Sequence, residues 1–364
     1  MMNEGYVTVH GKRFHYTWLR DHCLCPACYH PNSSQKIYDV SLSPLPPEPT
    51  SVEEGAEELR ILWKEAPPHE SVFPIGWLLS HSYDPVPGPE HQSALTMWDH
   101  PWLEAHPPEH FDASSTSFES WTRQLTTLGF AIIRRLAPED LHHWFGAIGP
   151  VHTTEYGDSS RVKPTPAAKD LAFSDAGDSL LPHTDGSYRY GERLLQFLYA
   201  HENTTVGGDS ILVDGFRVAR DFRLHHPNEF QVLARTPIRF RQYDKQTGYL
   251  FKHTTPILVL DGPGEVEAVY YSPKNIDWQL PFDQVAGYYQ AYSLFSQYLN
   301  DPAYQHRFRM ESGDCLLLQN FRVLHSRSQY DPSSGYRDFE TGYVDWSYVA
   351  GRVEYRSIDS QEGP

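Results

Sequence analysis

Apolar and polar residues alternate in short stretches over residues 6–80, and turn-forming residues separate these stretches. Alternation with a period of two is typical of half-buried β-strands, so we predict a small β-rich N-terminal domain over residues 1–85. The segment 43–58 is rich in Pro, Ser and Glu and indicates a surface loop between two strands. Residues 86–115 contain many Pro and His residues without periodicity, and we interpret them as a linker.

A different pattern follows this linker. Residues 117–129 have the apolar spacing of a helix, with a serine at the start and Gly129 at the end. From residue 183 onward β-strand patterns dominate, and one helix with an aromatic and aliphatic face interrupts them at 281–301. A few helices followed by many evenly spaced strands are typical of an antiparallel double-sheet barrel. We therefore predict a mainly β jelly-roll domain with flanking helices over residues 116–364.

The chain of 364 residues carries a formal net charge of −17. Phosphate binding needs clustered Lys and Arg, so this charge argues against nucleic acid and against an anionic membrane surface as partners. It permits a cationic small-molecule substrate, although a solvated acidic surface explains the same charge. No apolar run reaches the roughly 18 residues that cross a bilayer, and the first residues lack the features of a secretory or transit signal. We therefore expect an intracellular, cytoplasmic protein.

Three of the four cysteines, Cys23, Cys25 and Cys28, lie within six residues. Disulfides between such near neighbours are strained, so a zinc site is the better interpretation, with chance clustering of free thiols as the alternative. Zinc favours four ligands, and three thiolates leave one position for a histidine; a closed site of this kind is structural. Only a distant histidine would tie the domain together, which favours the last two of the candidates His22, His30, His69 and His81.

His183 and Asp185 lie two residues apart, and on a strand such residues project to one face, where they can chelate a single ion. This pair alone is weak evidence for a site. A second apolar strand ends in NFRVLHSR and supplies His325, which a barrel could return to the first pair. Two imidazoles and one carboxylate on one face of a metal form the facial triad of non-haem iron(II) oxygenases. The sequence therefore predicts a catalytic iron site at these three residues.

An oxygenase of this kind also needs a cation that holds the distal carboxylate of 2-oxoglutarate. Arg337 follows His325 by twelve residues, and its planar guanidinium matches a carboxylate. A surface salt bridge is the alternative interpretation of this arginine.

Several segments together resemble the taurine dioxygenase superfamily of iron(II)- and 2-oxoglutarate-dependent oxygenases. Within it, the segment WLRDHCLCPACYH and the VDGF run resemble the γ-butyrobetaine and trimethyllysine dioxygenases of carnitine synthesis. The resemblance covers about residues 6 to 352. The segments that carry it are HTDGSYRY from residue 183, TTVGGDSILVDGF from 204, NFRVLHSR from 320 and YRDFETGYVDW from 336.

The resemblance implies a double-stranded β-helix domain that uses Fe(II), 2-oxoglutarate and O2, together with a zinc-binding N-terminal domain and usually a homodimer. We expect ascorbate as the reductant. The resemblance also implies that His69 is the fourth zinc ligand. In the same way it places Leu198 and Ser210 in the 2-oxoglutarate pocket.

Family members that bind trimethylammonium groups surround them with aromatic rings. By resemblance, Tyr156 and Phe173 stand where two cage residues would lie, Asp170 takes an acidic position of the trimethyllysine enzymes, and Tyr188 takes the ring that follows HTD. Wall packing, or a cap in the case of Asp170, explains each of them equally well. The chain also departs from the family at Ser160 in place of a tryptophan, at Gly186 in place of an aromatic residue, and at Ser272 and Pro273 in place of two asparagines that contact a substrate carboxylate.

Three functions remain open from the residues. The first is a dioxygenase that hydroxylates a small amino-acid-like or quaternary ammonium metabolite and releases succinate and CO2. The second is the same machinery acting on a different, secondary metabolite, including desaturation or ring formation. The third is a zinc-stabilised binding protein that has lost turnover, which the intact triad and Arg337 argue against.

Overall fold

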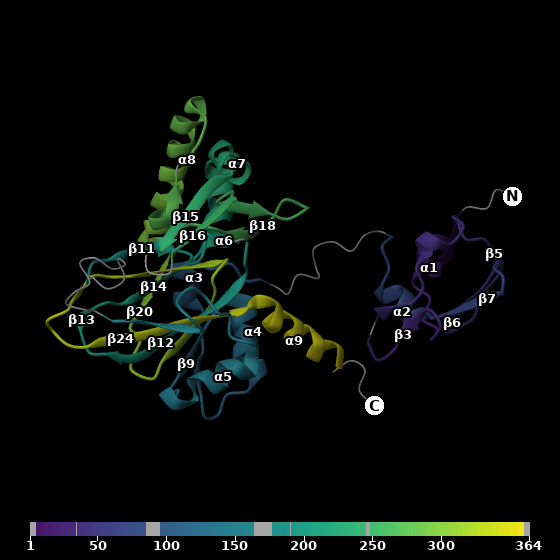
Figure 1. Cartoon of the computed structure of the whole chain (residues 1–364), viewed down its shortest axis with the longest axis horizontal. Helices are drawn as coiled ribbons and strands as arrows, with labels where there is room; N and C mark the ends of the chain where they lie inside the picture. The colour runs from purple at the N-terminus through teal and green to yellow at the C-terminus, as the bar shows by residue number, and fades with distance from the viewer. Residues whose placement is uncertain are drawn as a thin grey trace. The chain divides into compact units, whose positions relative to one another are not determined.

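The computed structural model describes residues 5–33, 35–84, 95–163, 177–189, 191–244, 248–277 and 279–359. The chain divides into two compact units, residues 1–94 and 95–364 (Figure 1). The segment 100–112, which lies in the predicted linker 86–115, contains a helix and a strand and belongs to the second unit.

The first unit is rich in short antiparallel strands, as the alternating pattern predicts. Its apolar core contains Phe14, Leu59, Ile61 and Trp63, which are fully or almost fully buried. The predicted loop at 43–58 is wrong in part, because residues 49–54 form an edge strand, where Pro is tolerated at the first position. The elements of this unit are β1 (Tyr6–Val9), β2 (Lys12–His15), α1 (Tyr16–Asp21), β3 (Tyr29–His30), β4 (Gln35–Lys36), β5 (Pro49–Glu54), β6 (Glu58–Trp63), β7 (His69–Pro74) and α2 (Ile75–Ser80).

Two sheets form the barrel of the second unit. In the described residues, neighbouring strands of both sheets are antiparallel except for the parallel pair β8–β9. One sheet has the order β10 (Ser159–Val162), β24 (Arg337–Asp345), β12 (Leu194–Asn203), β21 (Cys315–Gln319), β9 (Phe130–Arg134) and β8 (His110–Asp112). The other has the order β11 (Leu180–His183), β22 (Val323–Arg327), β14 (Ser210–Asp214) and β20 (Gln305–Phe308).

Side chains alternate along β12 between two apolar clusters. Phe197 faces a cluster that includes residues of α4 (Phe118–Leu128), α5 (Leu141–Ile148) and α9 (Trp346–Asp359), which cover the larger sheet from outside. Leu198 packs in the other cluster with Leu212 and Val323 of the smaller sheet. The two sheets therefore share a core, and the predicted mainly β jelly-roll fold is confirmed.

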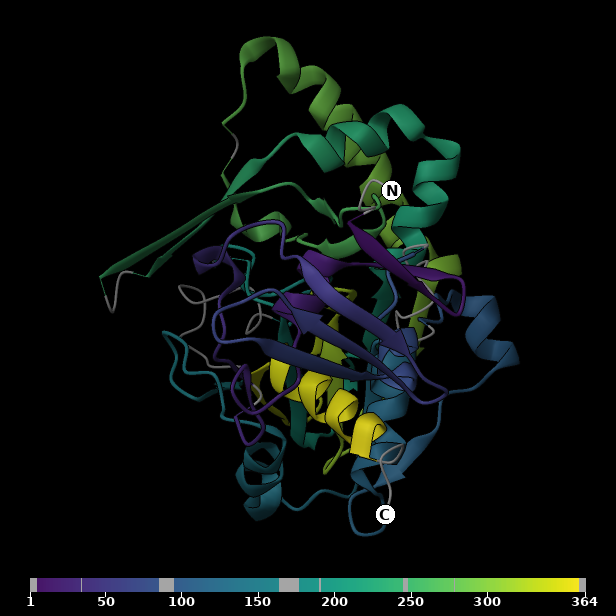
Figure 2. The ribbon, with the colours of Figure 1, turned by 90° about the vertical axis from the view of Figure 1, so that its right-hand side faces the viewer.

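Additional helices and strands cover the smaller sheet. Helices α6 (Gly215–His225), α7 (Pro227–Arg235) and α8 (Phe282–Asn300) pack against one another, and Figures 1 and 2 both show them together. Figure 2 also shows the pair β15–β16 extending away from these helices. None of the helices in the described part of the chain combines the length and the apolar character that a bilayer crossing requires. The remaining elements of this unit include α3 (His100–Ala105), β13 (Val206–Gly207), β15 (Ile238–Asp244), β16 (Tyr249–Thr255), β17 (Leu258–Leu260), β18 (Val266–Val269), β19 (Ile276–Asp277) and β23 (Tyr330–Asp331).

Candidate active site and metal centres

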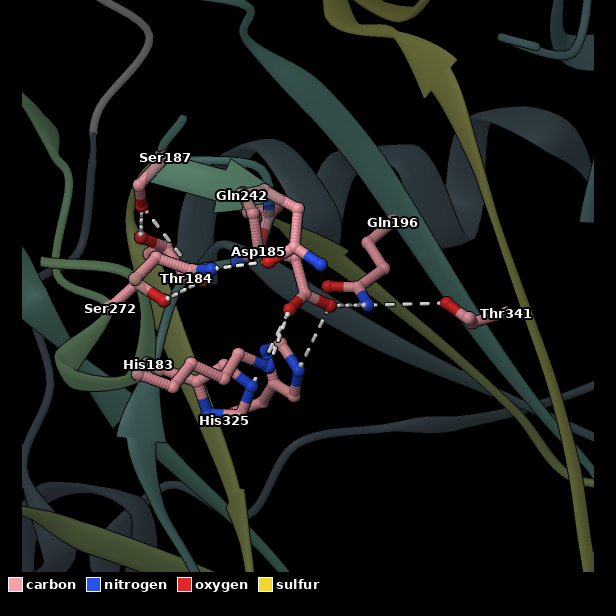
Figure 3. A network of polar contacts seen from close by, with 12 residues as sticks. His183, Thr184, Asp185, Ser187, Gln196, Gln242, Ser272, His325 and Thr341 are labelled. Atoms are coloured by element: carbon pink, nitrogen blue, oxygen red, sulfur yellow. Dashed lines mark hydrogen bonds and ion pairs between the residues drawn. The ribbon is translucent and has the colours of Figure 1, made fainter. Parts of the chain in front are cut away.

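Strand pairing brings the three predicted iron ligands together. His183 ends β11 and lies directly opposite His325 of the neighbouring antiparallel strand β22. The Nε2 atoms of both imidazoles lie 3.5 Å from the carboxylate of Asp185, one at each oxygen. One ligand atom from each residue lies within 4.8 Å of the others. Figure 3 shows both rings pointing at this carboxylate.

His183 and Asp185 of this cluster are in the protonation states that a metal needs. The Nδ1 of His183 donates to the carbonyl oxygen of Leu181 at 2.8 Å, which leaves the lone pair of Nε2 directed at Asp185. Burial, with a smaller contribution from the charge of Lys274, lowers the pKa of His183 to about 4. Burial opposes ionisation of Asp185, but the charge of Lys274 helps to hold the pKa of its carboxyl well below the ordinary value. A neutral imidazole and an ionised carboxylate therefore face each other at neutral pH.

Polar side chains from four other segments hold Asp185 in place. Its Oδ2 accepts hydrogen bonds from Gln196 Nε2 at 2.8 Å and from the hydroxyl of Tyr343 at 3.1 Å. The side-chain amide of Asn320 bonds both the backbone N–H and the carbonyl of Asp185, at 2.8 Å each. The ammonium of Lys274 lies 3.5 Å from Oδ1. These contacts fix the rotamer of the carboxylate, so the cluster is preorganised.

The sequence analysis missed these four residues. Gln196 and Asn320 had a usable signal, because each is a polar residue next to an apolar strand run, and buried polar groups need partners. Tyr343 and Lys274 had no comparable signal.

The geometry of the cluster fits an octahedral ion. Metal–ligand bonds of about 2.1 Å place neighbouring octahedral ligands about 3 Å apart, and the observed separations of 3.5 Å need only small side-chain movements. Two imidazoles and one carboxylate suit Fe(II) and leave the opposite face open.

Arg337 is buried without a carboxylate partner in the described residues. It begins β24, has 7% of its surface exposed, and its guanidinium lies 3.9 Å over the ring of Phe339. Its Nε has no hydrogen-bond partner in the described part of the chain. Burial and the nearby charges of Arg327 and Arg309 lower its pKa to about 9. A surface salt bridge does not describe this residue, since a buried cation of this kind requires an anion from outside the described chain.

The two other residues expected at the cosubstrate pocket lie on barrel strands. Leu198 pairs with Thr341 of β24 and belongs to the apolar core between the sheets. Ser210 begins β14, opposite Arg327 of β22, the strand that carries His325. Strand pairing thus places both on the strands next to the triad and Arg337.

The structure describes two of the four expected substrate residues. Tyr156 is 53% exposed, and its hydroxyl lies 3.3 Å from Nε2 of Gln242. The hydroxyl of Tyr188 donates to the side chain of Glu155 at 2.7 Å. Burial, followed by the charge of Glu155 and a smaller contribution from Asp185, raises the pKa of both tyrosines. The other two expected residues, Asp170 and Phe173, lie outside the described residues.

The cysteine cluster has the geometry of a tetrahedral zinc site. Nε2 of His69 lies 3.3, 3.8 and 3.5 Å from the sulfurs of Cys23, Cys25 and Cys28. Zn–S bonds of about 2.3 Å and Zn–N bonds of about 2.0 Å give a tetrahedral S···N separation of about 3.5 Å. Of the four candidate histidines, the structure brings His69 to the thiols. The rings of His22 and His81 instead bond backbone carbonyls of their own helices, and that of His30 bonds Ser33.

A buried arginine supports the cysteine cluster. Arg20 is 3% exposed, and its guanidinium donates to Glu65 at 2.6 and 3.0 Å and to the sulfur of Cys28 at 3.4 Å. Its plane also lies 3.6 Å over the ring of Tyr38. The donor to sulfur places positive charge beside the thiols.

The fold and the His–Asp–His cluster define a jelly-roll protein with a candidate non-haem metal centre. Residues 99–341 match the family described as taurine catabolism dioxygenase TauD, TfdA family. Because this match covers more than half of the chain, the protein belongs to that family. Residues 6–79 match the family described as γ-butyrobetaine hydroxylase-like, N-terminal.

Named relatives are similar over most of their length. The chain is 28% identical over 354 residues to a γ-butyrobetaine dioxygenase of Pseudomonas sp., covering 93% of this chain and 89% of the relative. It is 25% identical over 372 residues to a trimethyllysine dioxygenase of Meyerozyma guilliermondii, covering 96% and 92%. It is also 28% identical over 365 residues to dioxygenase str8 of Strobilurus tenacellus, covering 93% and 83%.

Among solved structures, an asparagine oxygenase in complex with Fe(II), 2S,3S-3-hydroxyasparagine and succinate has a TM-score of 0.50 and 12% identity, covering 63% of this chain and 77% of that one. This likeness supports the fold.

Proposed function

We propose that this chain is an Fe(II)- and 2-oxoglutarate-dependent dioxygenase that hydroxylates a small amino-acid-like or quaternary ammonium metabolite. The observation that carries the proposal is the convergence of His183, Asp185 and His325 on one side of the β11–β22 pair. Arg337 adds a buried cation whose Nε has no hydrogen-bond partner in the described residues. Membership of the TauD, TfdA family supports the same chemistry.

Each residue of the site has a distinct role in this proposal. His183 and His325 supply nitrogen ligands, and Asp185 supplies a charged oxygen ligand that Gln196 and Tyr343 orient. Bound iron couples the oxidative decarboxylation of 2-oxoglutarate by O2 to oxidation of a substrate C–H bond, with release of succinate and CO2.

Three residues serve the cosubstrate. Arg337 binds its distal carboxylate, because a guanidinium offers two parallel donors to the two oxygens. Leu198 provides an apolar wall that excludes water, and Ser210 provides a hydroxyl at the start of β14.

We assign the substrate side to the rings of Tyr156 and Tyr188, and to Asp170 and Phe173. Aromatic faces bind trimethylammonium groups by cation–π attraction, and the relatives named γ-butyrobetaine and trimethyllysine dioxygenase act on such compounds.

A second candidate keeps the iron chemistry and changes the substrate to a secondary metabolite, with desaturation or ring formation as further outcomes. Ser160, Gly186 and the segment at Ser272 depart from the carnitine enzymes, and Lys274 at this segment adds a charge beside the iron cluster.

We further propose that residues 1–85 form a domain that Cys23, Cys25, Cys28 and His69 stabilise through zinc, and that the catalytic domain includes 116–364 together with the helix and strand at 100–112. The homodimer, the cytoplasmic location and the ascorbate requirement stay predictions.

Succinate release from 2-oxoglutarate tests the proposed function. Purified protein with Fe(II) and ascorbate is assayed with γ-butyrobetaine, trimethyllysine and a panel of amino acids. Asp185→Ala removes the oxygen ligand, so we expect its turnover to fall by at least about a thousandfold. Asp283→Ala, at an exposed position on α8, is the matched control and should keep full turnover.

Full turnover by Asp185→Ala would refute the triad. Failure of both named quaternary ammonium compounds, with turnover of another substrate, would select the second candidate.

A further inference from the structure

A buried carboxylate outside the iron cluster joins the two segments that carry the described substrate rings. Glu155 directly precedes Tyr156, and its side chain is fully buried. One of its oxygens accepts a hydrogen bond from the hydroxyl of Tyr188 at 2.7 Å, and the other pairs with the guanidinium of Arg189. Tyr188 and Arg189 follow Asp185 of the iron cluster by three and four residues. Glu155 therefore connects the Tyr156 loop to the segment that follows the iron carboxylate.

Backbone hydrogen bonds close both of these segments into tight turns. Thr154 and Gly157 exchange N–H to carbonyl bonds at 2.9 and 3.0 Å, on either side of the buried carboxylate. In the second segment the N–H of Arg189 donates to the carbonyl of Gly186 at 2.8 Å, and Gly186 has the positive φ of 70° that glycine adopts without strain. Side chains on such short turns move with the backbone, so the bonds made by Glu155 hold one turn against the other.

The second turn also contacts the hairpin β15–β16. The guanidinium of Arg189 lies 5.4 Å from the ring centre of Phe251 on β16, and this ring lies 5.9 Å from that of Tyr188. Nδ1 of His253, on the same strand, lies 3.2 Å from the backbone carbonyl oxygen of the residue before Tyr188. The turn that follows the iron carboxylate is therefore held both by the buried carboxylate and by the hairpin.

Stability alone is a weak explanation for the ion pair of Glu155 and Arg189. The arginine side chain is 13% exposed, so both partners lose most of their hydration. This loss offsets most of the attraction, and well-packed apolar residues often stabilise such a place equally well. A second carboxylate, that of Glu192, lies 3.9 Å from the guanidinium, at the limit of an ion pair. The contacts of Glu155 instead define a geometry, because each of its two oxygens binds one donor.

We propose that Glu155 is a positioning residue of the substrate side, which holds the Tyr188 turn against the Tyr156 loop and so sets the spacing of the two rings. This role rests on the proposed function, which assigns both rings to the substrate. Because Tyr188 donates its O–H to Glu155, it offers a substrate its ring. The iron triad has supporting hydrogen bonds of its own, so a change at Glu155 should alter substrate placement and leave metal binding intact.

Kinetics of Glu155→Gln test this role. The full-length protein with zinc, Fe(II) and ascorbate is assayed with γ-butyrobetaine, trimethyllysine and the panel of amino acids, and both succinate and oxidised product are measured. Glutamine keeps the size of the side chain and removes the charge that holds Arg189. We expect KM for the oxidised compound to rise about tenfold or more, since a misplacement of about 1 Å can cost about a hundredfold in rate. Less oxidised product should form per succinate, whereas KM for 2-oxoglutarate and the iron content should stay those of wild type.

Two further variants separate positioning from general damage. Tyr188→Phe keeps the ring and removes the hydroxyl that Glu155 binds, so KM for the oxidised compound should rise by a smaller factor. Combining it with Glu155→Gln should add little to the loss of Glu155→Gln alone, because both changes break the same contact. Glu265→Gln is the matched control, because Glu265 pairs with Arg223 at the surface of the same unit, and it should behave as wild type.

Several outcomes overturn the role of Glu155. These are an unchanged KM and product yield in Glu155→Gln, fully additive losses in the double variant, and a loss of iron or 2-oxoglutarate binding that accompanies the change in KM. If Glu155→Gln fails to fold, an unchanged KM in Tyr188→Phe overturns it as well.

A wild-type protein that releases no succinate with any compound of the panel refutes the proposed function itself. Crystal structures of wild type and Glu155→Gln, with Mn(II) and N-oxalylglycine, then decide the positioning. A Tyr188 ring displaced by about 1 Å or more relative to Tyr156 supports it, since displacements of this size alter reactivity, and a ring in the same place overturns it.

Discussion

The two candidate metal centres differ in how their charge is balanced. Three thiolates and one imidazole around zinc complete a tetrahedron and carry one net negative charge, which Arg20 offsets from 3.4 Å. Two imidazoles and one carboxylate around Fe(II) leave one net positive charge and an open face. Lys274 lies beside the carboxylate ligand of this centre, and Arg337 is a second, buried cation at the start of β24. The closed centre is compensated by the protein, whereas the open centre needs anions that arrive with the reactants.

Removing one histidine from either centre should remove the metal of that centre and leave the metal of the other in place. His325→Ala loses an iron ligand and should retain less than about a tenth of the wild-type iron while it keeps one zinc per chain. His69→Ala should lose the zinc and destabilise the first unit, because a structural zinc contributes directly to folding. Metal analysis of both proteins after dialysis checks this.

If one substitution removed both metals from a protein that is still folded, the two sites would not be independent. Zinc content unchanged in both His69→Ala and Cys25→Ser would remove the zinc assignment.

Zinc binding should depend on pH much more strongly than iron binding. Burial raises the pKa of Cys23, and it raises that of Cys28 to about 12, so both thiols carry protons in the metal-free protein at neutral pH. Zinc must displace both protons, and its apparent affinity should rise by at least about a hundredfold per pH unit between pH 6 and 8. His183 and Asp185 are already deprotonated in this range and contribute no such slope to iron binding.

Competition with a chelator at three pH values measures this slope. A zinc affinity that is flat across the range would show that the thiols are not the ligands.

Arg337→Gln should weaken 2-oxoglutarate binding by about 50-fold, because a charge-assisted contact to a buried carboxylate contributes about 1.5–3 kcal/mol. Arg337→Lys should lose less, since the charge remains without the planar fork. Titration of the Mn(II) protein with N-oxalylglycine measures both losses, and zinc content should stay unchanged. An affinity within twofold of wild type in Arg337→Gln would assign the distal carboxylate to another residue.

The smallest expected effect is at Arg20. Arg20→Gln removes the donor to Cys28 and the partner of Glu65, so zinc should transfer to a chelator about tenfold faster, as supporting hydrogen bonds to ligands affect metal affinity by 10- to 100-fold. Arg20→Lys should restore part of the difference. An unchanged transfer rate in Arg20→Gln would mean that the cluster balances its charge without this residue.

Local sequence signals predicted the elements whose boundaries depend on local chemistry. Ser117 caps α4, and Gly129 ends it in the left-handed conformation with φ of 82°. The aromatic-rich segment forms α8 from Phe282 to Asn300. The strand at residues 49–54 escaped prediction because its pairing with β6 outweighs a Pro-rich, acidic composition.

The sequence predicted which residues could bind iron, because their residue types are those of metal ligands, but it did not predict how they come together. His183, Asp185 and His325 were candidates from their chemistry, but their meeting depends on the register of β11 against β22, which sequence spacing does not define. Lys274 escaped because its place depends on the bonds between Thr184 and Tyr271, two segments far apart in the chain.

The most direct test of the account is the visible absorbance of the anaerobic Fe(II) protein when 2-oxoglutarate is added. Chelation of iron by the keto acid gives a metal-to-ligand charge-transfer band, and it requires both the triad and its open positions. We predict a band that saturates at one 2-oxoglutarate per chain in wild type and is absent in His325→Ala, with zinc present in both proteins. A wild-type protein that holds one iron but develops no band, or a His325→Ala protein that keeps the full band, would contradict the account.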